Sequence, residues 1–407
     1  MKFYLRLRRF SAFIIGITFI ISGIFKLLDP VGTGLIVKDY YSFFHLGFLA
    51  SISKHVGWIL ALTETTIGLA LTTGIWRKRV AIITICFLGF FTILTTILLI
   101  FNPSMDCGCF GEVIHLSHLE TFIKNLILLA LSAIGFFPFK FLSSPKKRKI
   151  YLFYAAFGLV IIFSVYSWLY LPIIDFTTYK PSSELHNPAN NTSQNDSNFE
   201  ASFVYEKNGI QEVFTLENLP DSTWTYIKTE VISNKNEVTT SMPTLYIYGR
   251  NGESKDELVH LRNTMLISIY KPQSINKRKW EKIADYTRNL EKLGFNPLIL
   301  SSSINYNEAI LSIENKGLAP ESLARISKHL YTSDYKTLIT LNRSNSGLTY
   351  ISNSYIINKW ANIARPNEES LIKLLEKEPT EIYIEKNSRN TIVYNAYLLI
   401  ILLLVFI

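Results

Sequence analysis

The chain has 407 residues, of which 48% are hydrophobic and 18% charged, with a formal net charge of +9. This length accommodates two or three domains. Three cysteines exclude a disulfide framework, and the basic residues flank long apolar runs. The positive charge is therefore explained by membrane topology and requires no nucleic-acid partner.

Five apolar runs are long enough to cross a bilayer, which needs about 20 mostly apolar residues. They cover residues 10–25, 56–76, 80–101, 119–139 and 150–171. We predict five transmembrane helices, the first continuing into Lys26. A cleaved signal peptide is the alternative for the first run, but no small-residue cleavage site follows it. The C-terminal run, 392–407, is short for a span, so a sixth helix remains an open alternative.

Basic residues predict the orientation of these helices, because cytoplasmic loops are enriched in Lys and Arg. The N-terminus, the loop between helices two and three and the loop between helices four and five are the basic ones. Their residues are Lys2, Arg6, Arg8, Arg9, Arg77, Lys78, Arg79, Lys140, Lys146, Lys147, Arg148 and Lys149. We therefore place the N-terminus in the cytoplasm. The outer side of the membrane receives residues 26–55 and 105–112, and everything after 171 up to the apolar tail.

Two cysteines stand together in "MDCGCFGE", residues 105–112, on the predicted outer side. A disulfide between Cys107 and Cys109 would be strained, and it would close almost no loop, so it would contribute little stability. Such a pair suits redox exchange or metal binding better than a structural role. Cys86 lies within an apolar helix and is predicted to be a small buried hydrophobic residue.

Two features follow the cysteines. Ser117 and Glu120 have the spacing of a capping box, which predicts the start of helix four. His115 and His118 complete a C-x-C-x5-H-x2-H set that offers four zinc-type ligands, although this is not a common zinc spacing. Metal binding by these four residues is an alternative to redox exchange, and our main prediction assigns no metal.

Glu64 lies near the middle of the second apolar run. An ionisable side chain there is costly and faces the interior of a bundle. Two interpretations remain open: a proton acceptor beside a redox or quinone site, or a structural partner of Lys26 or of a backbone group. Lys26 and Asp29 are favoured as a snorkelling lysine and a turn before Pro30.

The region after the fifth run changes character. Residues 177–200 are rich in Asn, Ser and Pro and predict a polar linker. Beyond it, the patterns predict a β-hairpin at 201–216, a strand at 264–270, a helix at 274–294, a strand at 295–302, a helix at 306–317, a hairpin at 346–360 and a helix at 367–377. Strand, helix, strand, helix, hairpin and helix is the order of a thioredoxin-like domain.

This domain lacks the groups that thioredoxins use in catalysis. No cysteine lies between Lys271 and Trp280, where a C-x-x-C would stand, and Ser346 takes the place of the cis-proline. A domain without thiols does not exchange disulfides. We predict a binding or docking module, with an inert scaffold as the alternative.

The membrane part also carries a family resemblance. "CGCFGEVIHLSHLETFIKNLILLALS", "ISGIFKLLDPVGT" and "LALTETTIGLALTTG" resemble the methylamine-utilisation MauE family and the wider DoxX-like membrane proteins. The matching residues include Ser22, Gly23, Lys26, Asp29, Pro30, Glu64, Cys107, Gly108, Cys109, Phe110, Gly111, Ser117, Thr121, Lys124 and Asn125. The resemblance covers about residues 8–140. It implies a four-helix bundle in the cytoplasmic membrane and a role in thiol–disulfide or electron transfer.

We therefore predict a polytopic helical membrane domain at 1–172 with a MauE/DoxX-like core at about 8–140. A polar linker at 173–198, a soluble α/β thioredoxin-like domain at 199–390 and an apolar tail at 391–407 follow. The predicted site comprises Cys107, Cys109, Glu64 and Lys26. The hypothesis is a membrane thiol–disulfide oxidoreductase that exchanges electrons between a periplasmic protein partner and an acceptor in the bundle, for which a quinone is one candidate. The alternative is a non-enzymatic assembly factor whose soluble domain docks periplasmic proteins.

Overall fold

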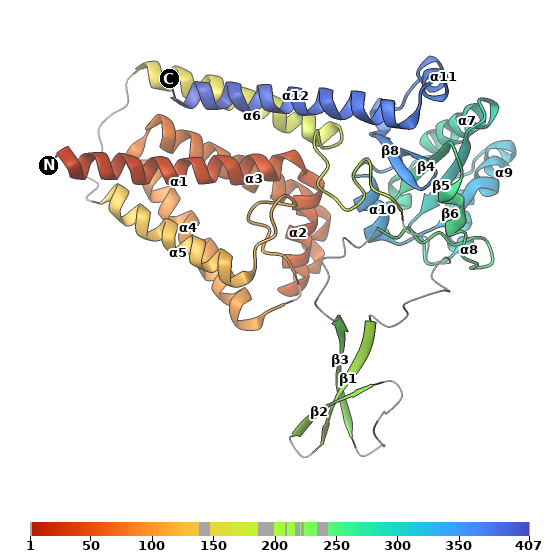
Figure 1. The fold of residues 1–407 in the computed structure, drawn as a ribbon, viewed down its shortest axis with the longest axis horizontal. Helices are drawn as coiled ribbons and strands as arrows, with labels where there is room; N and C mark the ends of the chain where they lie inside the picture. The colour runs from red at the N-terminus through yellow and green to blue at the C-terminus, as the bar shows by residue number, and fades with distance from the viewer. Residues whose placement is uncertain are drawn as a thin grey trace.

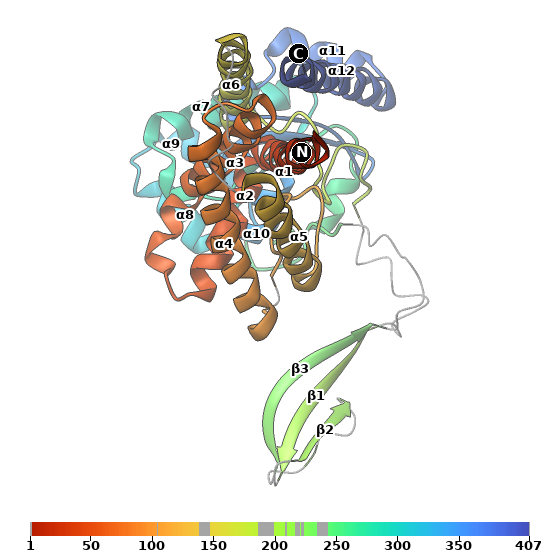
Figure 2. The same ribbon diagram turned by 90° about the vertical axis from the view of Figure 1, so that its left-hand side faces the viewer.

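The computed structural model describes residues 2–103, 105–137, 147–185, 199–207, 210–215, 220, 224–233 and 243–406. Three parts are visible: a helical bundle, a domain built on a five-stranded sheet, and a three-stranded sheet that stands apart from both (Figure 1). Figure 2 shows the same separation from the side. The predicted basic loop at 140–146 lies outside the described residues.

The bundle is built from long apolar helices. They are α1 (Lys2–Leu28), α3 (Ser53–Thr73), α4 (Arg77–Phe101), α5 (His118–Phe136) and α6 (Lys147–Leu169). In the described part of the chain, these five are long and apolar enough to cross a membrane, the second together with the preceding turn from Gly47. The prediction of five such helices is confirmed, and the chain is a multi-pass membrane protein.

Helices α1 and α3 approach each other closely because glycines occupy their contact. A Cβ atom on Gly23 would lie 2.1 Å from Thr65 Oγ1, and one on Gly68 would lie 2.7 Å from the carbonyl oxygen of Gly16. Small residues allow membrane helices to pack at short distance. This packing brings the C-terminal end of α1 against the middle of α3.

Helix α2 (Pro30–Phe43) follows α1 after a single residue and was not predicted as a separate element. Asp29 is its N-cap and accepts a hydrogen bond of 2.9 Å from the backbone N–H of Gly32, while Pro30 occupies the first turn. Val31 and Leu35 pack against a core cluster of the sheet domain. Helix α2 therefore joins the bundle to that domain.

The sheet domain has the strand order β6-β5-β4-β7-β8. Strands β4 (Thr264–Ile269), β5 (Asn296–Ser301) and β6 (Leu330–Thr332) are parallel, with Leu266 opposite Leu298. Strands β7 (Gly347–Ser352) and β8 (Tyr355–Trp360) form an antiparallel hairpin that extends the sheet beside β4. The predicted strands at 264–270 and 295–302 and the hairpin at 346–360 are present.

Helices cover this sheet on both sides of its buried strands (Figure 1). The predicted helices correspond to α7 (Lys277–Lys292), α8 (Tyr306–Glu314) and α11 (Glu368–Glu376). Trp280 of α7 is fully buried, and so are the side chains of Met265 and Ile267 on β4. Helices α9 (Pro320–His329) and α10 (Tyr335–Leu341) and the short strand β6 are additional.

Residues 173–185 lie against the sheet domain, although their composition predicts a linker. The backbone N–H of Ser182 donates to the carbonyl oxygen of Ile356 at 2.7 Å, and that of Leu185 to the carbonyl oxygen of Ser354 at 2.9 Å. The Leu185 side chain is buried in the same core cluster that α2 contacts. The few apolar residues of this stretch are enough to hold it on β8. Residues 186–198 of the predicted linker lie outside the described residues.

The three-stranded sheet has the order β2-β1-β3. Strands β1 (Phe199–Lys207) and β2 (Ile210–Thr215) pair antiparallel, which confirms the predicted hairpin, and β3 (Thr225–Ser233) pairs with the other edge of β1. The third strand was not predicted.

Helix α12 (Pro379–Phe406) contains the apolar tail and begins well before it. It runs beside α6 in the opposite direction, so its end lies on the same side of the bundle as the N-terminus (Figure 1). The ring of Tyr397 stacks on that of Phe163 with centroids 4.7 Å apart. The tail therefore packs on the bundle along α6.

Candidate functional site

The two neighbouring cysteines lie in the loop between α4 and α5, at the end of the bundle that faces the sheet domain (Figure 1). The predicted capping box closes this loop. The backbone N–H of Glu120 donates to Ser117 Oγ at 3.2 Å, and the backbone N–H of Ser117 donates to Glu120 Oε2 at 2.8 Å. The start of α5 is thereby fixed at His118.

The conformation of the cysteine loop depends on Gly108, which separates the two cysteines. Its φ is +65°, and a Cβ atom there would lie 2.5 Å from Cγ2 of Ile36 on α2. Both the left-handed backbone and the lack of space require glycine. The Tyr40 hydroxyl donates to the carbonyl oxygen of Cys107 at 3.0 Å. Helix α2 therefore holds the loop in place.

Phe110 anchors the other end of the cysteine pair. Its ring meets that of Phe25 edge to face with centroids 6.5 Å apart, and Lys124 Nζ lies 5.1 Å from its centroid. The pair is thus covered by bundle residues from α1 and α5.

All three cysteines are free thiols in this structure, and their environments differ. Cys107 is 6% exposed, whereas Cys109 is partly exposed. Burial raises the pKa of the Cys107 thiol to about 11. Cys86 is exposed on α4, so the prediction that it is buried is wrong.

Lys26 and Glu64 form a buried ion pair with Nζ and Oε2 2.5 Å apart. Ser22 Oγ lies 2.7 Å from the other carboxylate oxygen and 2.5 Å from the carbonyl oxygen of Cys109. The structural partnership of Glu64 with Lys26 is therefore present, and Lys26 does not snorkel to water as the favoured interpretation had it. One serine hydroxyl connects this pair to the cysteine loop.

Every predicted site residue lines one pocket of about 340 Å³ beneath the cysteine loop. Most of its wall is apolar, and the polar groups gather at the end near the loop. Drug-sized ligands occupy pockets of about 300–1,000 Å³ with this kind of lining. The wall includes Cys107, Cys109, Lys26, Glu64, Ser22, Tyr40, Lys124, Asn125, Ile36, Leu60, Phe87, Phe91 and Leu128.

The histidines point elsewhere. His115 Nδ1 lies 3.0 Å from Asp106 Oδ2, and His118 Nε2 lies 3.0 Å from the carbonyl oxygen of Met105. Within the described residues, no three His, Cys, Asp or Glu side chains come together as a metal site. The geometry gives the zinc-type alternative no support.

The sheet domain contributes one residue to the edge of the site. Arg343, just before β7, lies 2.8 Å from Asp29 Oδ2 and 3.5 Å from Glu112 Oε1, which follows the cysteine motif. Burial disfavours the charge of Arg343, but the two carboxylates outweigh this and raise its pKa. Burial also raises the pKa of Glu112. Asp29 therefore caps α2 and binds the sheet domain as well.

Sequence reasoning missed Tyr40 and Arg343 as parts of this site. Arg343 is separated from Asp29 by 314 positions, and nothing in the residues around it indicates the contact. Tyr40 belongs to the unpredicted helix α2. Its aromatic neighbours could only suggest a membrane interface.

Comparison with known protein families gives a match to the part of the chain that contains helices α1 to α5. Residues 5–138 match the family model "Methylamine utilisation protein MauE". This part of the chain is MauE-like. Residues 199–234, the range that contains strands β1, β2 and β3, match a domain of unknown function (DUF8463).

One curated relative is protein TlpB of Flavobacterium psychrophilum, with 27% identity over 186 residues. The match covers 45% of this chain and 49% of that protein, so the comparison spans about half of each. No solved structure matches the chain significantly.

Proposed function

We propose that the protein exchanges thiols and disulfides at the periplasmic face of the bacterial cytoplasmic membrane through Cys107 and Cys109. The observation that carries this proposal is that both cysteines and the Lys26–Glu64 pair line one pocket beneath a loop held by α2. The MauE-like character of residues 5–138 supports a membrane role for this pocket. The basic loops support the orientation with the cysteines outside.

The two thiols take different parts in this chemistry. Cys109 is the more exposed, so it meets the partner protein first. Its thiolate attacks one sulfur of a partner disulfide, which forms a mixed disulfide and releases a partner thiol. Cys107 then loses its proton and attacks Cys109, which releases the second partner thiol. The partner is reduced by two electrons, and Cys107 and Cys109 are oxidised to a disulfide.

The reverse sequence oxidises a partner dithiol. In both directions the cysteine pair must exchange two electrons and two protons with a second carrier. A quinone accepts this number of each on becoming a quinol, and an apolar pocket with a few polar groups at one end suits its ring. Lys26 and Glu64 would supply or receive the protons, because Ser22 connects this pair to the carbonyl oxygen of Cys109.

The sheet domain is proposed to be a thioredoxin-like docking module. Parallel strands β4 and β5 joined by α7, followed by the antiparallel hairpin β7–β8, support this identity. In this proposal, the sheet domain binds a periplasmic protein and presents it to the cysteine loop. The contact of Arg343 with Asp29 and Glu112 supports this role, because it holds the domain beside the residues that flank the cysteine loop.

The deciding experiment replaces both cysteines by serine in intact cells and measures the thiol state of periplasmic proteins. We expect loss of exchange in Cys107→Ser/Cys109→Ser and full exchange in Cys86→Ser, which removes the outward-facing cysteine of α4. A Cys107→Ser single variant should trap the partner on Cys109 as a mixed disulfide. Unchanged exchange in the double variant would reject the proposal.

A non-enzymatic assembly role is the second candidate, favoured by the buried contact between the sheet domain and the bundle. It predicts that deletion of 199–390 abolishes function while both cysteines are dispensable. The cysteine variants and the deletion therefore separate the two functions.

A further inference from the structure

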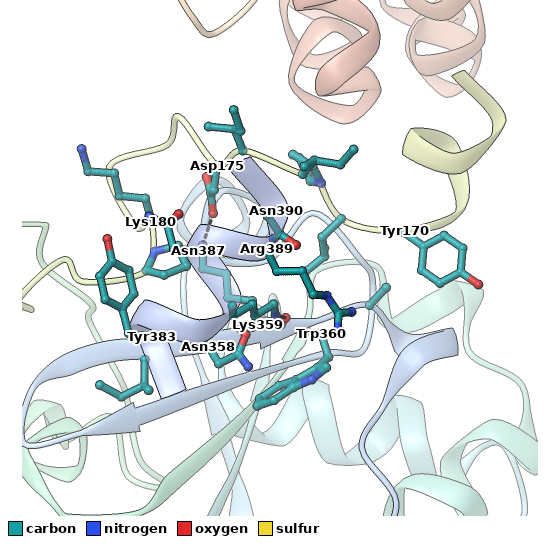
Figure 3. Close-up of a pocket in the computed structure, with 18 of the residues that line it drawn as sticks. Tyr170, Asp175, Lys180, Asn358, Lys359, Trp360, Tyr383, Asn387, Arg389 and Asn390 are labelled. Atoms are coloured by element: carbon teal, nitrogen blue, oxygen red, sulfur yellow. Dashed lines mark hydrogen bonds and ion pairs between the residues drawn. The ribbon is translucent and has the colours of Figure 1, made fainter. Parts of the chain in front are cut away.

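A second cavity, of about 760 Å³, shares Arg343 with the contact at Asp29 and Glu112 but contains none of the predicted site residues. Its walls come from the end of α6 with the chain that follows it, from β8, and from the first half of α12 (Figure 3). This cavity takes no part in the proposed thiol chemistry. The inference below is independent of that function.

The cavity carries an excess of positive charge. Five basic residues line it, namely Lys180, Arg343, Lys359, Lys386 and Arg389, against two acidic residues, Asp175 and Glu385. Figure 3 shows side chains from all three wall segments projecting into it.

Both acidic residues already have a cationic partner. Asp175 Oδ2 lies 2.6 Å from Nζ of the buried Lys359, and its other oxygen accepts from the backbone N–H of Thr177 at 2.9 Å. Glu385 Oε2 lies 2.7 Å from Nζ of Lys377, which is outside the cavity. Glu385 also attracts the charge of Arg389 on the same helix, so the cavity keeps an excess of cations over carboxylates.

Among the described residues, no carboxylate lies within ion-pair distance of Lys180, Lys386 or Arg389, although Glu385 attracts Arg389 from further away. Lys386 Nζ donates to Asn358 Oδ1 and, at 2.6 Å, to the carbonyl oxygen of Lys359. It also lies 5.1 Å from the ring centroid of Trp360. Burial, Lys359 and Arg389 lower the pKa of Lys386 to about 7. A bound anion would supply the negative partner that Lys386 lacks and would stabilise its charged form.

The position of the cavity indicates where such an anion comes from. Tyr166 and Tyr170 line it at the end of the apolar helix α6, and the apolar half of α12 begins just after Asn390. Tyrosine and tryptophan concentrate at the level of lipid headgroups. Basic pockets beside membrane helices bind anionic headgroups, and arginine matches the geometry of phosphate oxygens.

We propose that this cavity binds a phosphate-bearing anion through Arg389 and Lys386. The source we favour is the headgroup of an anionic phospholipid that enters between α6 and α12 from the outer leaflet. A water-soluble phosphate ester presents the same chemistry from the aqueous side.

The test uses the full chain in nanodiscs of phosphatidylcholine with increasing phosphatidylglycerol, and native mass spectrometry counts the phosphatidylglycerol retained. Lys386→Gln/Arg389→Gln removes two site cations. Arg288→Gln/Lys373→Gln is the matched control, because it removes two exposed cations of α7 and α11 that do not line the cavity. Loss of two charge-assisted contacts should weaken retention about tenfold or more in the first variant only.

A conservative variant, Lys386→Arg/Arg389→Lys, keeps both charges and should retain the lipid, which separates binding from folding. A second arm titrates glycerol phosphate into protein held in a neutral detergent. Binding there with the same pattern among variants, without lipid retention, would support the site with a soluble ligand. Equal retention in all four proteins, or binding of neither probe, would overturn the proposal.

Discussion

The hydroxyl of Ser22 lies between the buried Glu64 carboxylate and the carbonyl oxygen of Cys109, at 2.7 Å and 2.5 Å. A hydroxyl has one proton to donate, so Ser22 satisfies one of these two acceptors at a time. Lys26 holds the other oxygen of Glu64. The charge state of the ion pair is thus connected to the cysteine loop through one side chain.

The first prediction concerns the Lys26–Glu64 pair. Lys26→Met or Glu64→Gln leaves one member of a buried pair without its partner, which costs about 3–5 kcal/mol. The double variant Lys26→Met/Glu64→Gln leaves no unpaired charge and should be more stable than either single variant. The measurement is the Tm of the unmodified protein, the two single variants and the double variant in the same detergent, which together form a double-mutant cycle.

Lys124→Met is the matched control for that cycle. Lys124 lines the same pocket but contacts the ring of Phe110, so its removal leaves no carboxylate unpaired. An exposed cation–π contact contributes about 0.5–1 kcal/mol. Additive effects of the two single substitutions would show that Lys26 and Glu64 are not coupled.

The second prediction concerns Gly108. Gly108→Ala should lower Tm and expose the cysteines, since a left-handed conformation costs an alanine about 1–2 kcal/mol and the new methyl group meets Ile36. Adding Ile36→Ala should recover the part of the loss that is due to the contact. Gly89→Ala is the control, because nothing lies within 4 Å of a Cβ atom there. An unchanged Tm and unchanged alkylation of Cys109 would contradict this account of the loop.

The sequence predicted much of this arrangement because the bundle depends on local patterns. Apolar runs of about 20 residues indicated the five membrane helices, and the Ser117–Glu120 spacing indicated the start of α5. The pairing of Lys26 with Glu64 was among the interpretations, since a mid-membrane carboxylate needs a partner. Strands β4, β5, β7 and β8 followed from continuous apolar runs between turn residues.

The parts that were missed depend on contacts distant in sequence. Helix α2 is too short and too mixed in composition to be recognised, and it is stabilised by packing on both the bundle and the sheet domain. The stretch 173–185 is polar on average, yet Tyr179 and Leu185 are buried against β8 and its neighbours. The outward position of Cys86 depends on which face of α4 meets α5.

The third prediction concerns Arg343, which joins the sheet domain to Asp29 and Glu112. Arg343→Gln leaves the carboxylates of Asp29 and Glu112 without their buried cation. Removing one partner of a buried ion pair costs about 3–5 kcal/mol. We expect the sheet domain to separate from α2. Spin labels at Phe48 and Lys336, both exposed, in a chain with its three cysteines replaced, should give a broader distance distribution.

Arg288→Gln is the control for this separation, because Arg288 pairs with Asp285 on the exposed face of α7. The double variant Asp29→Asn/Arg343→Gln should dock better than Arg343→Gln alone, since it removes one of the two unpaired charges. The same narrow distribution in Arg343→Gln and in the unmodified chain would show that this contact does not hold the domain.

The fourth prediction concerns the pH dependence of Cys107, whose pKa burial raises to about 11. An unfolded chain titrates its thiols near pH 8.5, so the folded state holds this proton more tightly. The resulting stability is fully present below about pH 8.5 and is lost as pH rises towards 11. The Tm of the unmodified chain should therefore fall more steeply over this interval than the Tm of Cys107→Ser.

Alkylation rates test the same property without unfolding the protein. In a Cys86→Ser background, Cys109 should react first at neutral pH because it is more exposed, and the rate at Cys107 should keep rising up to about pH 11. Single variants Cys107→Ser and Cys109→Ser assign each rate to its thiol. If Cys107 reacts as fast as Cys109 at neutral pH, its thiol is not protected by burial and protonation, and the order of attack proposed for the exchange is contradicted.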